Sequence, residues 1–159
     1  MKSSIAFTFI RSGIYLFVAL IFGFLQWFAP LVNLMPQLAR AMQGWLEYVV
    51  WLIPGLIVAF IEAHRSSNTI IICLQTVGFL LAAIIGYYAG YAWDVFIIGE
   101  TFGLTDLAVG TSVDPAVQWR FFVDSIFPEM VEWGLFAIVT GLVLGIVAAV
   151  VKRFVFSKR

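Results

Sequence analysis

Residues 131–151 read VEWGLFAIVTGLVLGIVAAVV, and this stretch has the character of a helix inside a membrane. No charged side chain occurs from position 133 to position 151. An α-helix rises about 1.5 Å per residue, and it needs about 20 apolar residues to cross a hydrocarbon core roughly 30 Å thick. The stretch therefore predicts a transmembrane helix.

Three earlier stretches have the same character, so the sequence predicts four spans. We place them at about 12–31, 45–61, 69–93 and 131–151, with an extracytoplasmic loop over 94–130. Backbone groups in lipid must be satisfied within each segment, which favours helices. The first stretch is longer than the apolar part of a signal peptide, so we expect it to be a span. The predicted fold is all-α, with one transmembrane domain over 1–159.

The composition supports membrane insertion over a soluble fold. Of 159 residues, 63% are hydrophobic and 11% are charged. A soluble domain averages about 45–50% apolar and about 25% charged residues. The formal net charge is zero, which argues against a nucleic-acid partner, because such partners select strongly basic surfaces. Membrane lipids are the expected surroundings.

Two short amphipathic helices are expected at the membrane interface. Residues 36–43 alternate apolar and polar side chains at helical spacing, before the second span. Asp114 followed by Pro115 is typical of a helix start, and Pro128 is expected to end that helix before the fourth span. Its apolar face would carry Val117, Phe121 and Ile126, and its water-facing side Gln118, Arg120 and Asp124.

The charges are distributed unevenly between the two predicted sides. Residues 94–132 carry seven acidic side chains against the single base Arg120. Basic residues near spans favour the cytoplasmic side, so we expect a plasma (inner) membrane protein with both termini in the cytoplasm. The basic residues on the terminal side are Lys2, Arg11, Arg65, Lys152, Arg153, Lys158 and Arg159. Aromatic residues near the opposite ends of the spans agree: Trp27, Trp45, Tyr48, Tyr87, Tyr88, Tyr91, Trp93 and Trp133.

Small residues recur every fourth position in the third and fourth spans. Rows of this kind let two helix backbones approach closely, which is a main source of helix association in lipid. We expect the two rows to face each other within the chain; the alternative is that one of them faces another protein. The predicted helix-packing residues are Gly78, Ala82, Gly86 and Gly90 in the third span, and Ala137, Gly141, Gly145 and Ala149 in the fourth.

The polar residues within the spans are few. Arg11, Glu47 and Glu62 lie near span ends, where we expect them to reach water or lipid headgroups. Gln26 and Gln75 lie deeper, and we expect them to form hydrogen bonds between helices, with lining of a pore as the alternative.

Residue types that could perform chemistry are scarce. The chain has one histidine, His64, and one cysteine, Cys73, whereas a metal site usually needs three or four protein ligands. Motifs for a serine nucleophile or a phosphate-binding loop are absent from the sequence. We therefore predict no catalytic, metal-binding or cofactor-binding residues.

These features favour a non-catalytic accessory or structural subunit of a larger membrane complex. Its expected partners are lipids and other integral membrane subunits. The acidic segment 94–130 is either a solvated loop or a docking surface for a protein outside the cytoplasm. The alternative function is a small homo-oligomeric channel or transporter, although such proteins usually carry more polar residues in mid-span. Apolar grooves and aromatic residues could also hold a lipid or a pigment.

Overall fold

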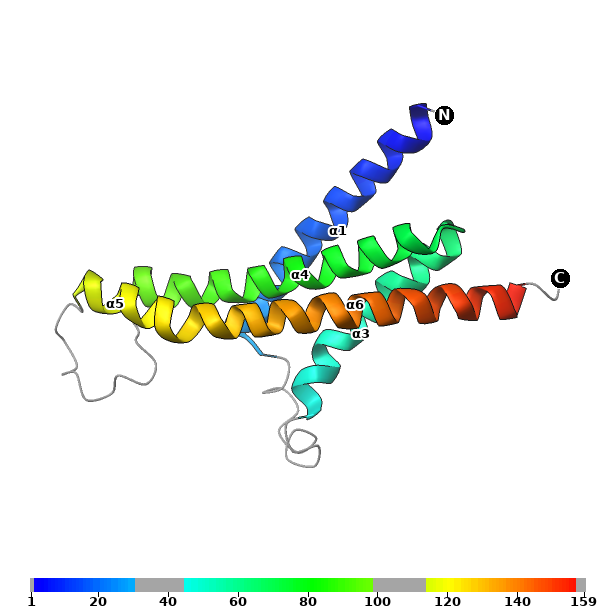
Figure 1. Cartoon of the computed structure of the whole chain (residues 1–159). Helices are drawn as coiled ribbons and strands as arrows, with labels where there is room; N and C mark the ends of the chain where they lie inside the picture. Colours follow the sequence, from blue (N-terminus) through cyan, green and yellow to red (C-terminus); the bar gives the residue numbers. More distant parts are fainter. Residues whose placement is uncertain (1, 31–44, 99–113, 157–159) are drawn as a thin grey trace.

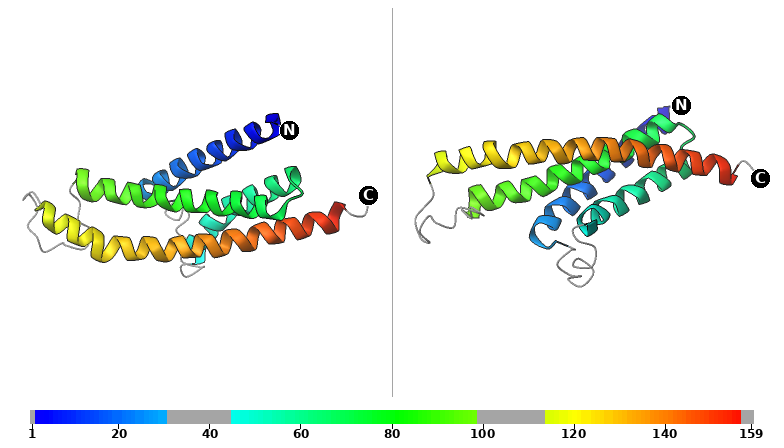
Figure 2. Two further views of the ribbon diagram at one scale, coloured as in Figure 1. Left: turned by 45° about the horizontal axis from the view of Figure 1, so that its top comes forward. Right: turned by 60° about the horizontal axis from the view of Figure 1, so that its bottom comes forward.

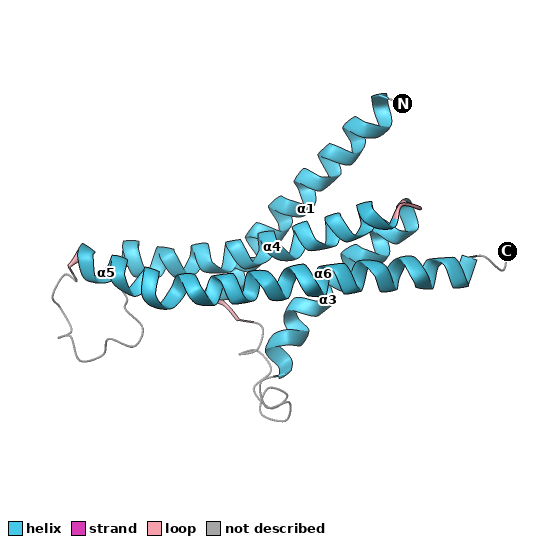
Figure 3. Ribbon diagram, in the orientation of Figure 1, coloured by secondary structure: helices cyan, strands magenta, loops and turns pink. Residues whose placement is uncertain are grey.

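Only helices and short connections occur in the part of the chain that the structure describes. The computed structural model describes residues 2–30, 45–98 and 114–156, and none of them lies in a β-strand (Figure 3). Four helices are long and apolar enough to cross a bilayer, within Phe9–Phe28, Tyr48–Arg65, Thr69–Ile97 and Pro115–Val155. The prediction of an all-α membrane protein with four spans is confirmed.

The helical segments follow the predicted spans but extend beyond most of them. In chain order they are α1 (Lys2–Phe28), α3 (Trp45–Arg65), α4 (Thr69–Trp93), the π-helical η2 (Asp94–Ile98), α5 (Pro115–Phe121), the π-helical η3 (Phe122–Ile126) and α6 (Phe127–Phe156). The predicted third span coincides with α4, whereas α1 begins earlier and α3 ends later than expected. The interfacial helix predicted at 36–43 lies outside the described residues.

Two helix starts have side-chain caps that follow from local sequence. The Asn68 side chain accepts a hydrogen bond from the amide of Ile70, 2.9 Å away, at the start of α4. Asp114 caps the amide of Ala116 at the same distance, with Pro115 in the first turn of α5. Asparagine and aspartate satisfy amides that have no partner within a helix, and proline has no such amide to satisfy. The predicted helix start at Asp114 is confirmed.

The helix α4 lies at the centre of the molecule. It packs most extensively on α1 and α6, and α3 contacts both α4 and α6. Figures 1 and 2 show α4 and α6 running side by side, while α1 and α3 cross them obliquely. Both chain ends lie at the same end of the molecule in Figure 1. Because α4 has neighbours on several sides, more of its surface is buried than that of any other candidate span.

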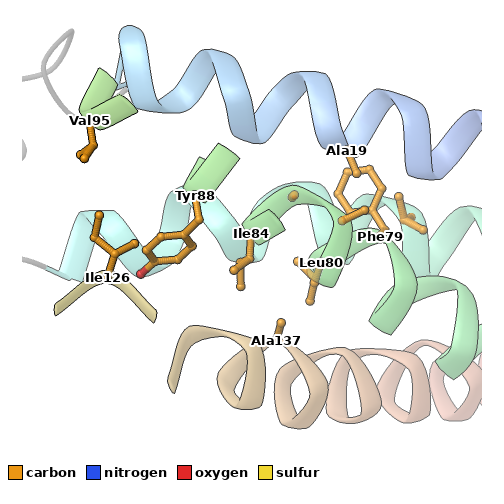
Figure 4. Close-up of a cluster of buried hydrophobic side chains, with 11 residues drawn as sticks. Ala19, Phe79, Leu80, Ile84, Tyr88, Val95, Ile126 and Ala137 are labelled. Atoms are coloured by element: carbon orange, nitrogen blue, oxygen red, sulfur yellow. The ribbon is translucent and has the colours of Figure 1, made fainter. Parts of the chain in front are cut away.

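The apolar core follows α4 along its length. Its cluster of buried residues takes members from every described segment except α5, and Figure 4 shows several of them in contact. Small side chains are frequent in it, so the helices approach closely. The cluster consists of Ala19, Val58, Phe79, Leu80, Ala82, Ala83, Ile84, Tyr88, Val95, Ile126 and Ala137.

Large apolar side chains cover much of the outer surface. Phe9, Ile10 and Phe17 of α1 are 74%, 63% and 64% exposed. In water, apolar surface costs about 25 cal/mol for each Å² exposed, whereas a lipid chain covers it without that cost. The exposed face of α1 therefore fits a lipid surrounding.

The described parts of the polar segment, 94–98 and 114–130, differ from the predicted loop and surface helix. The chain is helical over Asp94–Ile98, and a helix runs from Pro115 through Pro128 to Phe156 without a break. Proline usually ends or kinks a helix because its ring crowds the preceding turn. Here η3 ends two residues before Pro128, and the Phe127 amide donates to the carbonyl of Phe122, five residues back. We attribute the tolerance of Pro128 to this wider turn.

Candidate interaction surface

The small-residue row of α4 faces α1. A β-carbon added to Gly90 would lie 2.8 Å from the Trp27 β-carbon, and one added to Gly86 would overlap the backbone carbonyl of Leu20. Gly23 of α1 meets the backbone of α4 in the same way, at Ala83. Such distances leave no room for any side chain larger than hydrogen. The two backbones are therefore in direct contact.

The small-residue row of α6 faces a different side of α4. A β-carbon added to Gly141 would lie 2.7 Å from the α-carbon of Val77, and one added to Gly145 would lie 2.7 Å from that of Cys73. The rows do not face each other, so that prediction is wrong. The reason is geometric. The glycines of α6 meet Val77 and Cys73 of α4, and Val77 directly precedes Gly78 of the small-residue row. Successive residues are about 100° apart around a helix, so Val77 and Gly78 point in different directions.

A buried ion pair joins α1 to α3. The guanidinium of Arg11 donates to a Glu62 carboxylate oxygen at 2.9 Å, and the Tyr15 hydroxyl donates to the other oxygen at 2.9 Å. The Glu62 side chain is fully buried and that of Arg11 is 14% exposed. The expectation that Glu62 reaches water or headgroups is wrong. A paired carboxylate avoids most of the cost of burying an isolated charge, so the pair acts as a neutral clamp.

Polar contacts between helices continue beside this pair. The Gln75 amide of α4 donates to the Ser12 hydroxyl of α1, 2.5 Å away, which confirms the hydrogen bond predicted for Gln75. At the same end, Lys152 donates to the Ser66 carbonyl at 2.9 Å, and so ties α6 to the turn before α4. We call this end, which carries Arg11, Lys152 and the chain termini, the basic end.

The opposite end, which we call the acidic end, is held by aromatic rings. Trp27 stacks on Tyr91 with ring centroids 4.2 Å apart, and its indole N–H donates to the Asp94 carboxylate. Asp94 is 7% exposed and directly follows α4. Tryptophan and tyrosine are typical of a bilayer boundary, because their rings are apolar while their N–H or O–H group forms a hydrogen bond with water or a partner. The acidic end thus begins near the cluster formed by Trp27, Tyr91 and Asp94.

Beyond the cluster, two short helical segments pack against each other. We call residues 94–98 and 114–128 the extension. Its two sides meet at Val95 and Ile126, both essentially buried, which Figure 4 shows pointing toward one another beside Tyr88. The Gln118 amide donates to the Val95 carbonyl at 2.9 Å. Because a π-helical turn shifts the backbone hydrogen bonds, such a side-chain donor helps to hold η2 in place.

The continuous helix formed by α5, η3 and α6 is longer than a bilayer requires. The window from Pro115 to Val155 has 41 residues, which corresponds to about 60 Å of helix, or about twice the hydrocarbon thickness. The part without charged side chains, 133–151, is about 28 Å long and fills the core alone. We infer that the extension stands outside the hydrocarbon layer.

Three aromatic rings gather on the extension. The centroid of Phe96 lies 6.3 Å from that of Trp119 and 5.6 Å from that of Phe122, and Trp119 and Phe122 stack at 5.9 Å. We call these three residues the aromatic patch. Trp119 is 60% exposed and Phe96 is 38% exposed. Sequence reasoning missed Trp119; a large ring that directly follows Gln118 and precedes Arg120 in the sequence was the available signal.

The remaining candidate residues for chemistry are scattered. Among the described residues, no group of three or more His, Cys, Asp or Glu side chains is placed to hold a metal ion. His64 is exposed at the end of α3, whereas Cys73 is buried against α6. These two residues therefore lie in different surroundings.

No known protein family, curated protein or solved structure matches the chain. The fold and the surface define its class without such a match. It is an all-α, multi-pass membrane protein with four candidate spans.

Proposed function

We propose that the protein is a non-catalytic accessory or structural subunit of a larger membrane complex, which it stabilises by binding other integral membrane subunits. The aromatic patch is the observation that carries the proposal. Trp119 is 60% exposed on a segment that the spans do not need in order to cross the bilayer. Exposed apolar surface in water is unfavourable by about 25 cal/mol per Å², so grouped exposed rings favour a partner surface that covers them.

The charges around the patch indicate the kind of surface that fits it. Asp114, Asp124 and Glu129 are exposed on the same helical segment, and Arg120 is the base among them. A partner with an apolar centre and a basic rim would cover the rings and meet carboxylates at the edge. Tryptophan is also among the residues that contribute most to binding at protein interfaces.

The orientation belongs to the same proposal. Arg11, Arg65, Lys152 and Arg153 lie at the basic end, and basic residues next to spans favour the cytoplasm. We therefore place both termini in the cytoplasm of a plasma (inner) membrane protein, with the extension on the opposite face. The partner surface would then be an extracytoplasmic part of a neighbouring subunit.

Site-specific photo-cross-linking in the native membrane tests the proposal. A photoreactive phenylalanine analogue replaces Trp119 in one variant and Phe154 in the other. Phe154 is a matched control, because it is an aromatic residue, 73% exposed, at the basic end. We expect the Trp119 variant to give one discrete product with a second polypeptide, and we expect Phe154 to give cross-links to lipid.

Two results would contradict the proposal. Cross-links from position 119 only to residues of the same chain would mean that the chain covers its own patch. Cross-links only to a second copy of the chain would favour the homo-oligomeric channel or transporter.

A further inference from the structure

A hollow at the acidic end is lined by three aromatic rings and one carboxylate. Its volume is about 200 Å³, and its lining residues are Tyr48 of α3 with Glu132, Trp133 and Phe136 of α6. The ring centroids of Tyr48 and Trp133 are 5.4 Å apart in a stacked pair. Phe136 lies 5.6 Å from Tyr48 and 5.4 Å from Trp133, steeply inclined to both rings. Three of the four residues that line the hollow are therefore aromatic, and the fourth is acidic.

This combination of side chains suits a cation with an apolar shell. Ring faces attract cations electrostatically, and sites of several rings recognise quaternary ammonium groups in particular. Glu132 adds a negative charge, and no described basic side chain lies within ion-pair distance of it. A trimethylammonium group gives up little hydration when it enters such a site, because its charge is covered by methyl groups.

The position of the hollow indicates the source of that cation. Trp133 is the first residue of the uncharged stretch 133–151, and Glu132 directly precedes it. The hollow therefore lies where the hydrocarbon core gives way to the headgroups. We propose that it binds the trimethylammonium headgroup of a phosphatidylcholine-type lipid, with the acyl chains lying along the apolar surface of α3 and α6.

A headgroup methylation series tests the proposal on the purified full-length chain. Native mass spectrometry measures the dissociation constant of the first lipid bound, for phosphatidylethanolamine, its N-monomethyl and N,N-dimethyl forms, and phosphatidylcholine. All four lipids carry the same acyl chains. We expect affinity to rise along the series, with phosphatidylcholine binding about 5-fold more tightly than phosphatidylethanolamine.

Substitutions test whether the preference for phosphatidylcholine arises at the hollow. Trp133→Leu and Tyr48→Leu should each abolish the difference in affinity between phosphatidylethanolamine and phosphatidylcholine. Glu132→Gln should weaken phosphatidylcholine binding about 3-fold. Phe154→Leu, a change at an exposed ring far from the hollow, should keep the full preference.

Three outcomes would overturn the proposal. The first is equal affinity of the unmodified chain for all four lipids, a result that does not depend on whether any variant folds. The second is a preference that survives both ring substitutions. The third is displacement of the lipid by choline alone at equal concentration, which would make the hollow a site for a free cation.

Discussion

Gly86 and Gly141 are positions where one methyl group should disturb the packing of two helices. Gly86→Ala would place its β-carbon into the Leu20 carbonyl, and Gly141→Ala would place one 2.7 Å from the Val77 α-carbon. Because backbone atoms cannot move aside independently, each change should lower the free energy of unfolding by about 1–3 kcal/mol. Reversible unfolding in mixed micelles, followed by circular dichroism, measures the change.

Gly134→Ala is the matched control, because a β-carbon there has no atom within 4 Å. It should leave stability unchanged or raise it by up to about 1 kcal/mol, since alanine favours a helix more than glycine does. Equal effects of all three substitutions would refute the close contacts.

The ion pair between Arg11 and Glu62 gives a second prediction. Arg11→Met or Glu62→Leu alone leaves one charge buried without its partner, so each should cost about 3–5 kcal/mol of stability. The double variant should cost clearly less than the sum, because it removes both charges together. A double-mutant cycle measures this coupling, and strictly additive costs would show that the pair does not act as a unit.

Sequence reasoning succeeded for residues whose environment is set locally and failed for Glu62. The capping role of Asp114 follows from its neighbour Pro115. The burial of Glu62 depends on Arg11 and Tyr15, which come from a helix distant in sequence. Nothing in the local sequence of α3 indicates that α1 crosses at that point.

At the level of elements, the unbroken helix from Pro115 to Phe156 gives a distance that can be measured. Spin labels on Ala116→Cys and Val151→Cys, in a Cys73→Ser background, should lie about 50 Å apart between backbone positions. If α5 instead turned onto the membrane surface at Pro128, the separation would fall to about 40 Å. Double electron–electron resonance distinguishes the two, and a single population near the shorter distance would refute the continuous helix.

The number of spans was predictable because hydropathy sets it, but only α4 agrees with its predicted bounds at both ends. The extension was not, because its polar residues and Pro128 are typical of a loop. Its helicity relies on the π-helical turn and on the Gln118 contact with Val95, neither of which has a sequence signature.

For the whole molecule, the arrangement of helices around α4 could not be predicted from composition or periodicity. The small-residue rows indicate that α4 and α6 each pack closely on a neighbouring helix, and each of them does. They do not say which neighbour each row meets, because several arrangements of four apolar helices bury similar surfaces. Gly86 and Gly90 pack on α1, where Gly23 allows the two backbones to approach and Trp27 covers Gly90.

The two ends of the molecule should lie on opposite sides of the membrane. In a Cys73→Ser background, Ser125→Cys of the extension should react with an impermeant thiol reagent in intact cells, and Ser157→Cys should react only after the cells are opened. The charge distribution is the physical reason. Labelling at position 157 but not at position 125 in intact cells would reverse the proposed orientation.

The most direct test of the proposed function is the mass of the assembly that the protein forms when it is extracted in mild detergent. Native mass spectrometry should find the chain with at least one different polypeptide at fixed stoichiometry. Trp119→Ser should release the chain from that assembly, and Phe154→Ser should leave the assembly intact. A purified species that contains only copies of this chain, or an assembly unaffected by Trp119→Ser, would contradict the account.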